Sequence, residues 1–278
     1  MSELELSAGT IEYEDTGGPG PALVFVHGLI MDGSLWRNVI ADLRSDFRCI
    51  APTLPLGGHR RSMRRDADLS MRGIAMLLGE LIEGLELDGV TLAMNDWGGA
   101  QLLVGSRYDA RIARLALCAC EAFDNVPPKG AARLLPYIAR VPGGMTATLQ
   151  PFRFHGLRRL PMTYGPLSKR PVPREVMDRW FEPALRDRGV RRDLRKYVLS
   201  SAQGRRELIG IGDALGGFDR PALVAWAVED KLMPRDHGRR LAELLPQGEL
   251  VEIEDSYTLI PEDQPQVLAG CLRGLMRR

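Results

Sequence analysis

The chain has 278 residues, of which 45% are hydrophobic and 26% are charged. These proportions exclude the disordered and fibrous classes, and the length suffices for one large α/β domain with an insertion or for two small domains. The 37 basic and 36 acidic residues nearly balance, and a formal net charge of +1 gives no overall field that would attract nucleic acid or an anionic membrane.

Predicted strands and predicted helices alternate along most of the chain. Residues 4–14 alternate between apolar and polar side chains around Ala8-Gly9, which predicts an antiparallel hairpin at the edge of a sheet. Continuous apolar runs, such as residues 22–26, are typical of parallel strands that helices cover on both faces. The elements after the hairpin are predicted, in chain order, as a strand at 22–26, a helix at 34–43, a strand at 47–51, a helix at 68–87, a strand at 90–94, a helix ending near 108, a strand at 112–120, a strand at 221–228, a helix at 234–245, a strand at 249–253 and a helix at 261–276.

One long segment interrupts this alternation. Residues 124–217 are rich in proline, arginine and helix formers, and they contain no strand pattern. We therefore predict an α/β fold with a doubly wound, mostly parallel sheet, formed by residues 1–123 and 218–278, and a helical cap of residues 124–217 inserted in it. In such a sheet ligands bind at the carboxyl ends of the strands, which places the site beneath the cap.

The strongest motif follows the predicted strand at 90–94. The sequence Asn95-Asp96-Trp97-Gly98-Gly99 is typical of a nucleophile elbow, in which a tight, strained turn presents one side chain at the sheet edge. The backbone N–H groups of Trp97 and of Leu29, which follows His27-Gly28, are expected to form an oxyanion hole beside Asp96. The next helix is expected to favour the ionised form of Asp96 through its N-terminus.

The Asp-Trp-Gly-Gly elbow in this context resembles the haloalkane dehalogenase and epoxide hydrolase branch of the α/β-hydrolase superfamily. The resemblance implies that Asp96 attacks carbon and forms an alkyl-enzyme ester, which a water molecule activated by a histidine then hydrolyses. It implies that Asp230 orients this histidine and that the indole N–H of Trp97 binds a halide. The substrate-binding residues expected beneath the cap are His27, Trp36, Trp97, Tyr164 and Trp180.

The sequence departs from that branch at three positions. Leu29 stands where dehalogenases commonly have an asparagine, and Ile30 stands where epoxide hydrolases usually have a proline. The segment after the strand at 249–253 contains no histidine, and Tyr257 is assigned to the histidine position. A phenol with a pKa of about 10 is a poor general base at neutral pH, although it can donate a proton or a hydrogen bond.

Two other residues are candidates for the missing acid or base. His59 lies in a loop on the active side of the sheet and is the alternative base. Glu121, just after the strand at 112–120, is the alternative acid, although a carboxylate at the cap entrance is its simpler interpretation. The remaining histidines, His155 and His237, are expected to be packed or exposed.

The sequence leaves two classes of activity open. The first is hydrolysis of a carbon–halogen bond or an epoxide in a small apolar molecule, with Asp96 as nucleophile. The second is a non-hydrolytic lyase, isomerase or cyclase with Asp96 as acid or base, which the loss of the histidine favours. A catalytically inactive binding protein is the third and least favoured alternative, because the elbow, the oxyanion loop and Asp230 are present.

The expected partners are a small-molecule substrate and a second copy of the chain, with no metal, cofactor, nucleic acid or membrane. A cytoplasmic location is expected, because the first residues carry no apolar signal segment and the four cysteines have no disulfide or metal spacing. Five arginine pairs are interpreted as solvated helix faces: Arg60-Arg61, Arg64-Arg65, Arg158-Arg159, Arg191-Arg192 and Arg205-Arg206.

Overall fold

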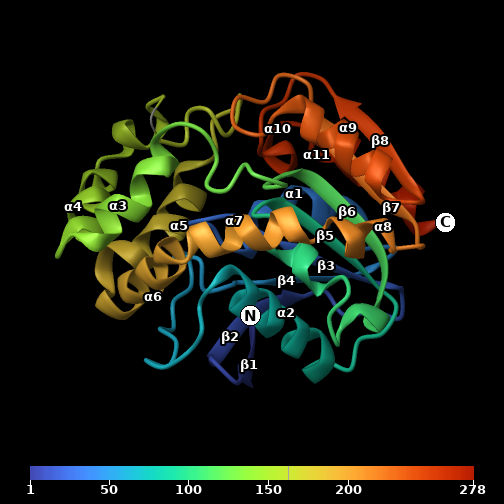
Figure 1. Cartoon of the computed structure of the whole chain (residues 1–278), viewed down its shortest axis with the longest axis horizontal. Coiled ribbons are helices and arrows are strands. Elements are labelled where there is room, and N and C mark those ends of the chain that lie inside the picture. Colours follow the sequence, from blue (N-terminus) through green and yellow to red (C-terminus); the bar gives the residue numbers. More distant parts are fainter. Residues whose placement is uncertain (162) are drawn as a thin grey trace.

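An eight-stranded sheet lies at the centre of the computed structural model, which describes residues 1–161 and 163–278 (Figure 1). In sheet order the strands are β1 (Ser2–Leu6), β2 (Gly9–Asp15), β4 (Arg48–Pro52), β3 (Ala22–Val26), β5 (Val90–Asp96), β6 (Ile112–Cys120), β7 (Ala222–Ala227) and β8 (Gly248–Ile253). The hairpin β1–β2 and the pair β2–β4 are antiparallel, and the other neighbouring strands are parallel. The predicted fold class, a doubly wound and mostly parallel sheet, is confirmed.

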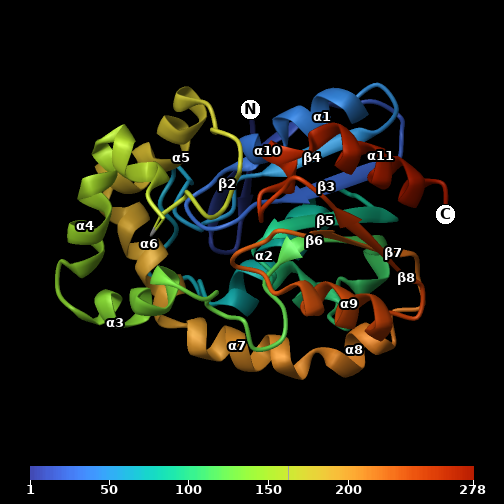
Figure 2. The ribbon, with the colours of Figure 1, turned by 90° about the horizontal axis from the view of Figure 1, so that it is seen from above.

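The apolar runs of the sequence form the central strands because both faces of these strands are covered. Every residue of β3 and β7 is buried, and so is every residue of β5 except the last, Asp96. Figure 2 shows α1 and α11 on one side of the sheet and α2, α7, α8 and α9 on the other. The helices of this core are α1 (Arg37–Leu43), α2 (Met71–Gly84), α9 (Arg235–Leu244), α10 (Ile260–Asp263) and α11 (Pro265–Met276).

Between β6 and β7 the described residues contain helices and no strand. These helices are α3 (Leu135–Arg140), α4 (Gly144–Leu149), α5 (Arg174–Arg186), α6 (Arg188–Leu199), α7 (Ser201–Gly210) and α8 (Gly212–Gly216). The first four gather beside one end of the sheet, whereas α7 and α8 run along its side (Figures 1 and 2). The core of the cap is aromatic, because the Phe181 ring lies 5.0 Å from the rings of both Phe152 and Tyr164. No described helix is long and apolar enough to cross a membrane.

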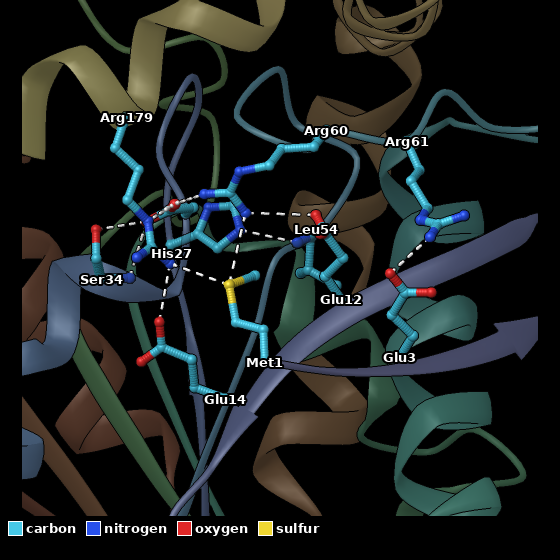
Figure 3. Close-up of polar contacts among 11 residues, drawn as sticks. Met1, Glu3, Glu12, Glu14, His27, Ser34, Leu54, Arg60, Arg61 and Arg179 are labelled. Atoms are coloured by element: carbon cyan, nitrogen blue, oxygen red, sulfur yellow. Dashed lines mark hydrogen bonds and ion pairs between the residues drawn. The ribbon is translucent and has the colours of Figure 1, made fainter.

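An ionic network joins the cap to the sheet edge. Asp32, which is fully buried, accepts hydrogen bonds from Ser34 and pairs with Arg179 of α5 and with Arg60. Figure 3 shows Arg179 also reaching Glu14 of β2, at 2.8 Å. Burial alone would raise the pKa of Asp32, but the charge of Arg179 and the Ser34 hydrogen bonds lower it below its ordinary value. The cap is therefore held to the core by a buried carboxylate that requires its arginines.

The strand order places the candidate site. The chain runs from β3 outward to β4, then returns to β5 on the other side of β3, so the order reverses between β3 and β5. Ligands bind at such a switch point, at the carboxyl ends of the strands. Leu29, which follows β3, and Asp96, which ends β5, meet at this point.

Candidate active site

Asp96 occupies the elbow conformation that the sequence predicts. Its φ of 65° lies in the left-handed region, which a residue other than glycine adopts only when the surrounding structure imposes it. The oxyanion loop approaches closely, because a Cβ atom on Gly28 would lie 1.8 Å from Asp96 Oδ2. The absence of a side chain at Gly28 lets the Leu29 N–H reach the same carboxylate oxygen at 3.3 Å.

The ionisation of Asp96 differs from the expectation. Burial raises its pKa from 3.8 to about 7, the Leu29 hydrogen bond opposes this increase, and the charge of Asp230 adds to it. The expected helix N-terminus behind Asp96 is absent, because the glycine pair is followed by a short 3-10 helix, Gly99–Leu103. So short a helix has only a small dipole, which does not offset the effect of burial on the Asp96 pKa. The prediction that the helix stabilises the Asp96 anion is therefore wrong.

The two predicted oxyanion donors differ in what they contact. The Leu29 N–H points at Asp96, as expected, whereas the Trp97 N–H donates to the carbonyl of Asn95 at 2.8 Å within the elbow turn. The indole Nε1 of Trp97 is buried without a well-formed hydrogen bond to a described residue, and the Tyr197 phenol lies near it, since hydrogen bonding with Trp97 lowers the Tyr197 pKa. A poorly satisfied buried donor is costly, so this N–H is available to a ligand beside Asp96.

The residue that faces Asp230 is Thr258. Its side chain is fully buried and its hydroxyl donates to Asp230 Oδ1 at 2.9 Å, beside the backbone N–H groups of Leu232 and Met233. Tyr257, which the sequence assigns to the histidine position, therefore does not take the hydrogen bond with Asp230. Burial raises the pKa of Asp230 to about 6, against the effect of those three hydrogen bonds, and its Oδ2 atom is buried without a partner.

Tyr257 lies at the outer side of the same loop. Its ring packs under two ammonium groups, with Lys231 Nζ 4.1 Å and Lys169 Nζ 5.6 Å from the ring centroid. Its N–H donates to the buried carboxylate of Asp263, which also accepts from Lys169 N and from the Ser168 hydroxyl of the cap. Asp263 thereby fixes the loop so that Tyr257 faces the lysines and Thr258 faces Asp230.

None of the four histidines lies against Asp96 in the structure. His27 is buried with Nδ1 against Gly28 O and Nε2 accepting from Leu54 N, and burial lowers its pKa to about 4 (Figure 3). His59 contacts Asp193 of α6 through Nε2 and accepts from Gly57 N through Nδ1. Both rings are committed to structural contacts, so His59 is poorly placed to serve as the alternative base.

The other two histidines are remote from the elbow. His155 lies 3.5 Å from Asp178 on the cap, and His237 packs edge-on against Phe123 with Asp124 at 4.0 Å. Burial lowers the pKa of His237, so its neutral form is favoured at neutral pH.

Glu121 is more closely tied to Asp96 than its sequence position indicated. Its backbone N–H donates to Asp96 O at 2.9 Å, and its side chain is buried with Oε2 unpartnered. Burial raises its pKa well above the ordinary value, and the charge of Asp96 raises it further, so both effects favour the protonated carboxyl. Glu121 is therefore a buried acid and not a solvated carboxylate at the cap entrance.

Tyr197 is a second cap tyrosine that lies near the candidate site. It lies on α6 and is buried, and its raised pKa reflects burial first and then the charges of Glu121 and Asp96. Its position on the buried face of an amphipathic helix was visible in the sequence, but nothing there indicated which core strand it would face.

The predicted substrate-binding aromatics separate into two groups. Trp36 and Trp180 are fully buried and their indole groups donate to Val26 O and Ser34 Oγ, which makes them structural. Tyr164 lies close enough to Asp96 for that charge to raise its pKa further beyond the effect of burial. Its hydroxyl contacts the carbonyl oxygens of Leu29 at 2.7 Å and Ile30 at 2.9 Å, so it holds the oxyanion loop beneath the cap.

The described residues thus bring together one buried and two half-buried carboxyl groups, a buried indole N–H and two phenols. Within residues 1–161 and 163–278 no three histidine, cysteine, aspartate or glutamate side chains are arranged to hold a metal ion. The arrangement can transfer protons through carboxyl groups and can donate hydrogen bonds to a ligand beside Asp96.

Comparison with known proteins agrees with this architecture. A family model described as alpha/beta hydrolase fold matches residues 21–265. The cis-3-alkyl-4-alkyloxetan-2-one decarboxylase of Xanthomonas campestris pv. campestris is 26% identical over 96% of this chain and 92% of its own length. Haloalkane dehalogenase 2 of Mycobacterium tuberculosis is 24% identical over 97% of this chain and 92% of its own length.

Solved structures show the same fold. A putative ancestral haloalkane dehalogenase superposes with a TM-score of 0.80 at 21% identity and covers all of this chain and 98% of its own. Haloalkane dehalogenase DbeA from Bradyrhizobium elkani has a TM-score of 0.79 at 22% identity and covers 99% of this chain and 98% of its own. The sheet topology, the elbow and the extent of the family match lead to one assignment: the chain belongs to the alpha/beta hydrolase fold family.

Proposed function

We propose that this chain is a non-hydrolytic enzyme of the alpha/beta hydrolase fold, a lyase in which Asp96 is the base and Glu121 the acid. The observation that carries the proposal is the contact of Thr258, in place of an imidazole, with Asp230. Each of the four histidines makes its contacts away from Asp96. The proposed site therefore lacks the group that would activate water against an aspartyl ester.

The threonine hydroxyl does not replace that group. A hydroxyl can donate or accept a hydrogen bond, but it does not take up a proton from water at neutral pH. An imidazole with a pKa of about 6.5 does so, and this property makes hydrolysis of an ester intermediate efficient. An ester on Asp96 would consequently persist, and repeated turnover by hydrolysis would stop.

The carboxyl groups suit a reaction without water. With a pKa of about 7, Asp96 is substantially ionised at neutral pH and remains basic enough to take a proton from a substrate. The pKa of Glu121 is raised well above its ordinary value, chiefly by burial, which favours its protonated form as the proton donor. Because Asp96 and Glu121 lie in different environments, we assign Asp96 as the base and Glu121 as the acid.

The proposed step is an elimination in a small apolar molecule. Asp96 takes a proton from the carbon next to the one that bears an oxygen leaving group. The C–H electron pair forms the carbon–carbon double bond, the carbon–oxygen bond breaks, and the leaving oxygen takes the proton of Glu121. The two carboxyl groups then exchange one proton through solvent to return to their starting states. The Trp97 indole N–H and the Leu29 N–H can donate to the departing oxygen.

The curated relative named as an oxetan-2-one decarboxylase supports a search among substrates that lose a group without reacting with water. Its name describes a strained lactone with two alkyl substituents. We propose the same substrate class, small molecules with a carbon–oxygen leaving group flanked by alkyl chains, for this chain.

Nucleophilic attack by Asp96 is the second candidate function. Its positive φ and the nearby Leu29 N–H favour this role, because they are the features of a nucleophile elbow. In this case a haloalkane or epoxide would alkylate Asp96, and the ester would accumulate.

Turnover in water enriched in oxygen-18 distinguishes these functions. The wild type would be incubated with cis-3,4-dialkyloxetan-2-ones, alkyl esters, haloalkanes and epoxides. The masses of the products and of the intact protein would then be measured by mass spectrometry. The proposal expects an unsaturated product without oxygen-18, many turnovers and no added mass on the protein. An alcohol or diol containing oxygen-18 would contradict it, and added mass on the peptide that contains Asp96 would establish the second candidate.

A further inference from the structure

The cap contains a segment from which acidic residues are missing. Between Asp124 and Glu175, residues 125–174 include no aspartate and no glutamate, although the whole chain has 36 acidic residues. The same segment contains nine basic residues: Lys129, Arg133, Arg140, Arg153, Arg158, Arg159, Lys169, Arg170 and Arg174. The segment therefore has a strong local excess of positive charge, although the net charge of the whole chain is close to zero.

This segment also carries most of the chain's conspicuously exposed apolar side chains. Tyr137 and Phe154 are 68% and 69% exposed, and Leu134, Val141 and Leu160 are exposed by 45% or more. Single apolar side chains on a surface are ordinary, but five within 27 residues, on a positively charged background, are not scattered at random.

Three of these side chains cluster at one short helix. Tyr137 is exposed on α3, Leu134 ends the 3-10 turn that leads into α3, and Val141 follows α3 in extended backbone. The opposite face packs inward, because Ala139 is fully buried and its carbonyl accepts from Arg195 of α6. Both views place α3 and α4 at the end of the molecule away from the carboxyl terminus (Figures 1 and 2).

The exposed basic residues here have no carboxylate partners. Lys129, Arg133, Arg140, Arg153 and Arg159 are exposed, and none of them forms an ion pair with a described residue. Arg140 instead lies over the Tyr137 ring, 5.6 Å from its centroid. Arg158 differs, since it is buried and paired with Asp178 at 2.7 Å. The uncompensated charge is consequently carried by the exposed side chains, which are free to meet an anionic partner.

We propose that this surface, here called the cap tip and consisting of the exposed side chains of residues 129–160, docks on an anionic lipid bilayer. Aromatic and aliphatic side chains among arginines are the combination that enters the interfacial region of a bilayer, while the cationic groups remain among its headgroups. Asp178 and Glu182 of α5 lie beside Arg153, and Asp178 pairs with Arg158, but the segment itself carries no acid, so its exposed arginines and lysine leave an excess of positive charge that is complementary to phosphate headgroups. No described helix can cross a membrane, so the attachment is peripheral.

A bilayer fits the cap tip better than a folded acidic protein does. The exposed apolar side chains come from α3, from the residues on either side of it, and from the short 3-10 turns at 150–159 with Leu160, and they are separate in the sequence. A stable protein interface needs a packed apolar centre of matching shape, whereas a fluid bilayer accommodates separate protruding groups. The inference goes beyond the proposed chemistry and does not depend on it.

Co-sedimentation with vesicles tests the proposal. The probes are vesicles of phosphatidylcholine alone and of phosphatidylcholine with 40% phosphatidylglycerol, at about 0.1 M salt, where surface charges still act over about 10 Å. The wild type should bind the anionic vesicles, bind the neutral vesicles at least about tenfold more weakly, and be released by high salt. Each basic residue near an anionic surface contributes about fivefold in affinity, so the triple variant Arg133→Gln, Arg140→Gln, Arg153→Gln should bind about 100-fold more weakly.

Matched substitutions at the other end of the molecule serve as controls. Val267 is exposed on α11 and Arg277 lies near the carboxyl terminus, so V267S with R277Q removes the same kinds of side chain away from the cap tip. This control should bind as the wild type does, whereas Tyr137→Ser with Phe154→Ser should weaken binding at least about tenfold. Equal loss in the control, equal binding to both kinds of vesicle, or no binding at all would overturn the proposal. Binding to polyglutamate as tight as to anionic vesicles would assign the cap tip to an acidic protein instead.

Discussion

Replacing Asp96 by asparagine should stabilise the protein while abolishing its activity. Burial raises the pKa of Asp96 from 3.8 to about 7, so the folded protein holds a proton there over a pH range in which the unfolded chain has lost it. Where the folded state binds more protons, the free energy of unfolding falls as the pH rises. The asparagine keeps the size and polarity of the protonated acid and removes this penalty.

The magnitude follows from the shift. A difference of about three pKa units corresponds to about 4 kcal/mol, since each unit is worth about 1.4 kcal/mol. Asp96 keeps some contact with solvent, so about 2–4 kcal/mol is the expected gain in the free energy of unfolding above pH 7. The gain should vanish near pH 4 and grow between pH 4 and 7. At about 2–4 °C per kcal/mol for a chain of this size, the melting temperature should rise by about 5–10 °C at pH 8.

Melting curves of both proteins at pH 4, 6 and 8 provide the test. Asp66→Asn is the control, because Asp66 is exposed and forms no ion pair with a described residue, so this change removes a charge without removing a buried one. A gain that is the same at every pH, or a variant less stable than the wild type at pH 8, would refute the argument that burial of the Asp96 carboxylate costs stability.

The remaining predictions concern the site and its closure. Thr258→His should place an imidazole against Asp230; under the proposed elimination this variant should release no product containing oxygen-18, whereas such a product in mass spectra would establish Asp96 as a nucleophile. Gly28→Ala should lower kcat at least about 100-fold, because its Cβ would displace the Asp96 side chain; unchanged kcat would contradict this. In a pH profile, kcat/KM should rise as Asp96 ionises near pH 7. The charge of Asp230 contributes to the raised pKa of Asp96, so in Asp230→Asn this rise should occur at lower pH. Arg179→Met should lower the free energy of unfolding by about 1–3 kcal/mol, measured with urea, because a buried carboxylate loses its closest cation.

The sheet and its order along the chain were predictable from the sequence because burial on both faces leaves a direct signature. The apolar run at 22–26 becomes β3 with those same bounds, and the run at 112–120 becomes β6. The sequence pattern also predicted a helix from the elbow to about residue 108, and this prediction was wrong. Gly98 and Gly99 lower helix propensity there, and the 3-10 segment that forms ends at Leu103, well before Tyr108.

The site was only partly predictable, and the errors have a common physical origin. The position of Asp96 follows from local sequence, since the elbow is built by adjacent residues. Which loop residue faces Asp230 depends on the turn that precedes it, and the Asp263 contacts rotate Tyr257 outward. His59 is held by Asp193, a residue 134 positions away, and no local pattern could disclose that contact.

The loss of stability that comes from placing Asp96, Glu121 and Asp230 beside one another is evidence about function. Asp96, Glu121 and Asp230 all have raised pKa values because they are buried, and two of them leave a buried oxygen atom without a partner. A fold that needed only stability would replace such groups with apolar side chains, since unpaired buried carboxyl groups destabilise the native state. Elsewhere in the chain the buried carboxylate of Asp32 has arginines and that of Asp263 has four donors, so the fold satisfies buried acids where they are structural. The three acids with strongly raised pKa values lie beside the elbow, where a substrate could supply hydrogen-bond partners, and this arrangement supports the proposed working site over an inactive remnant.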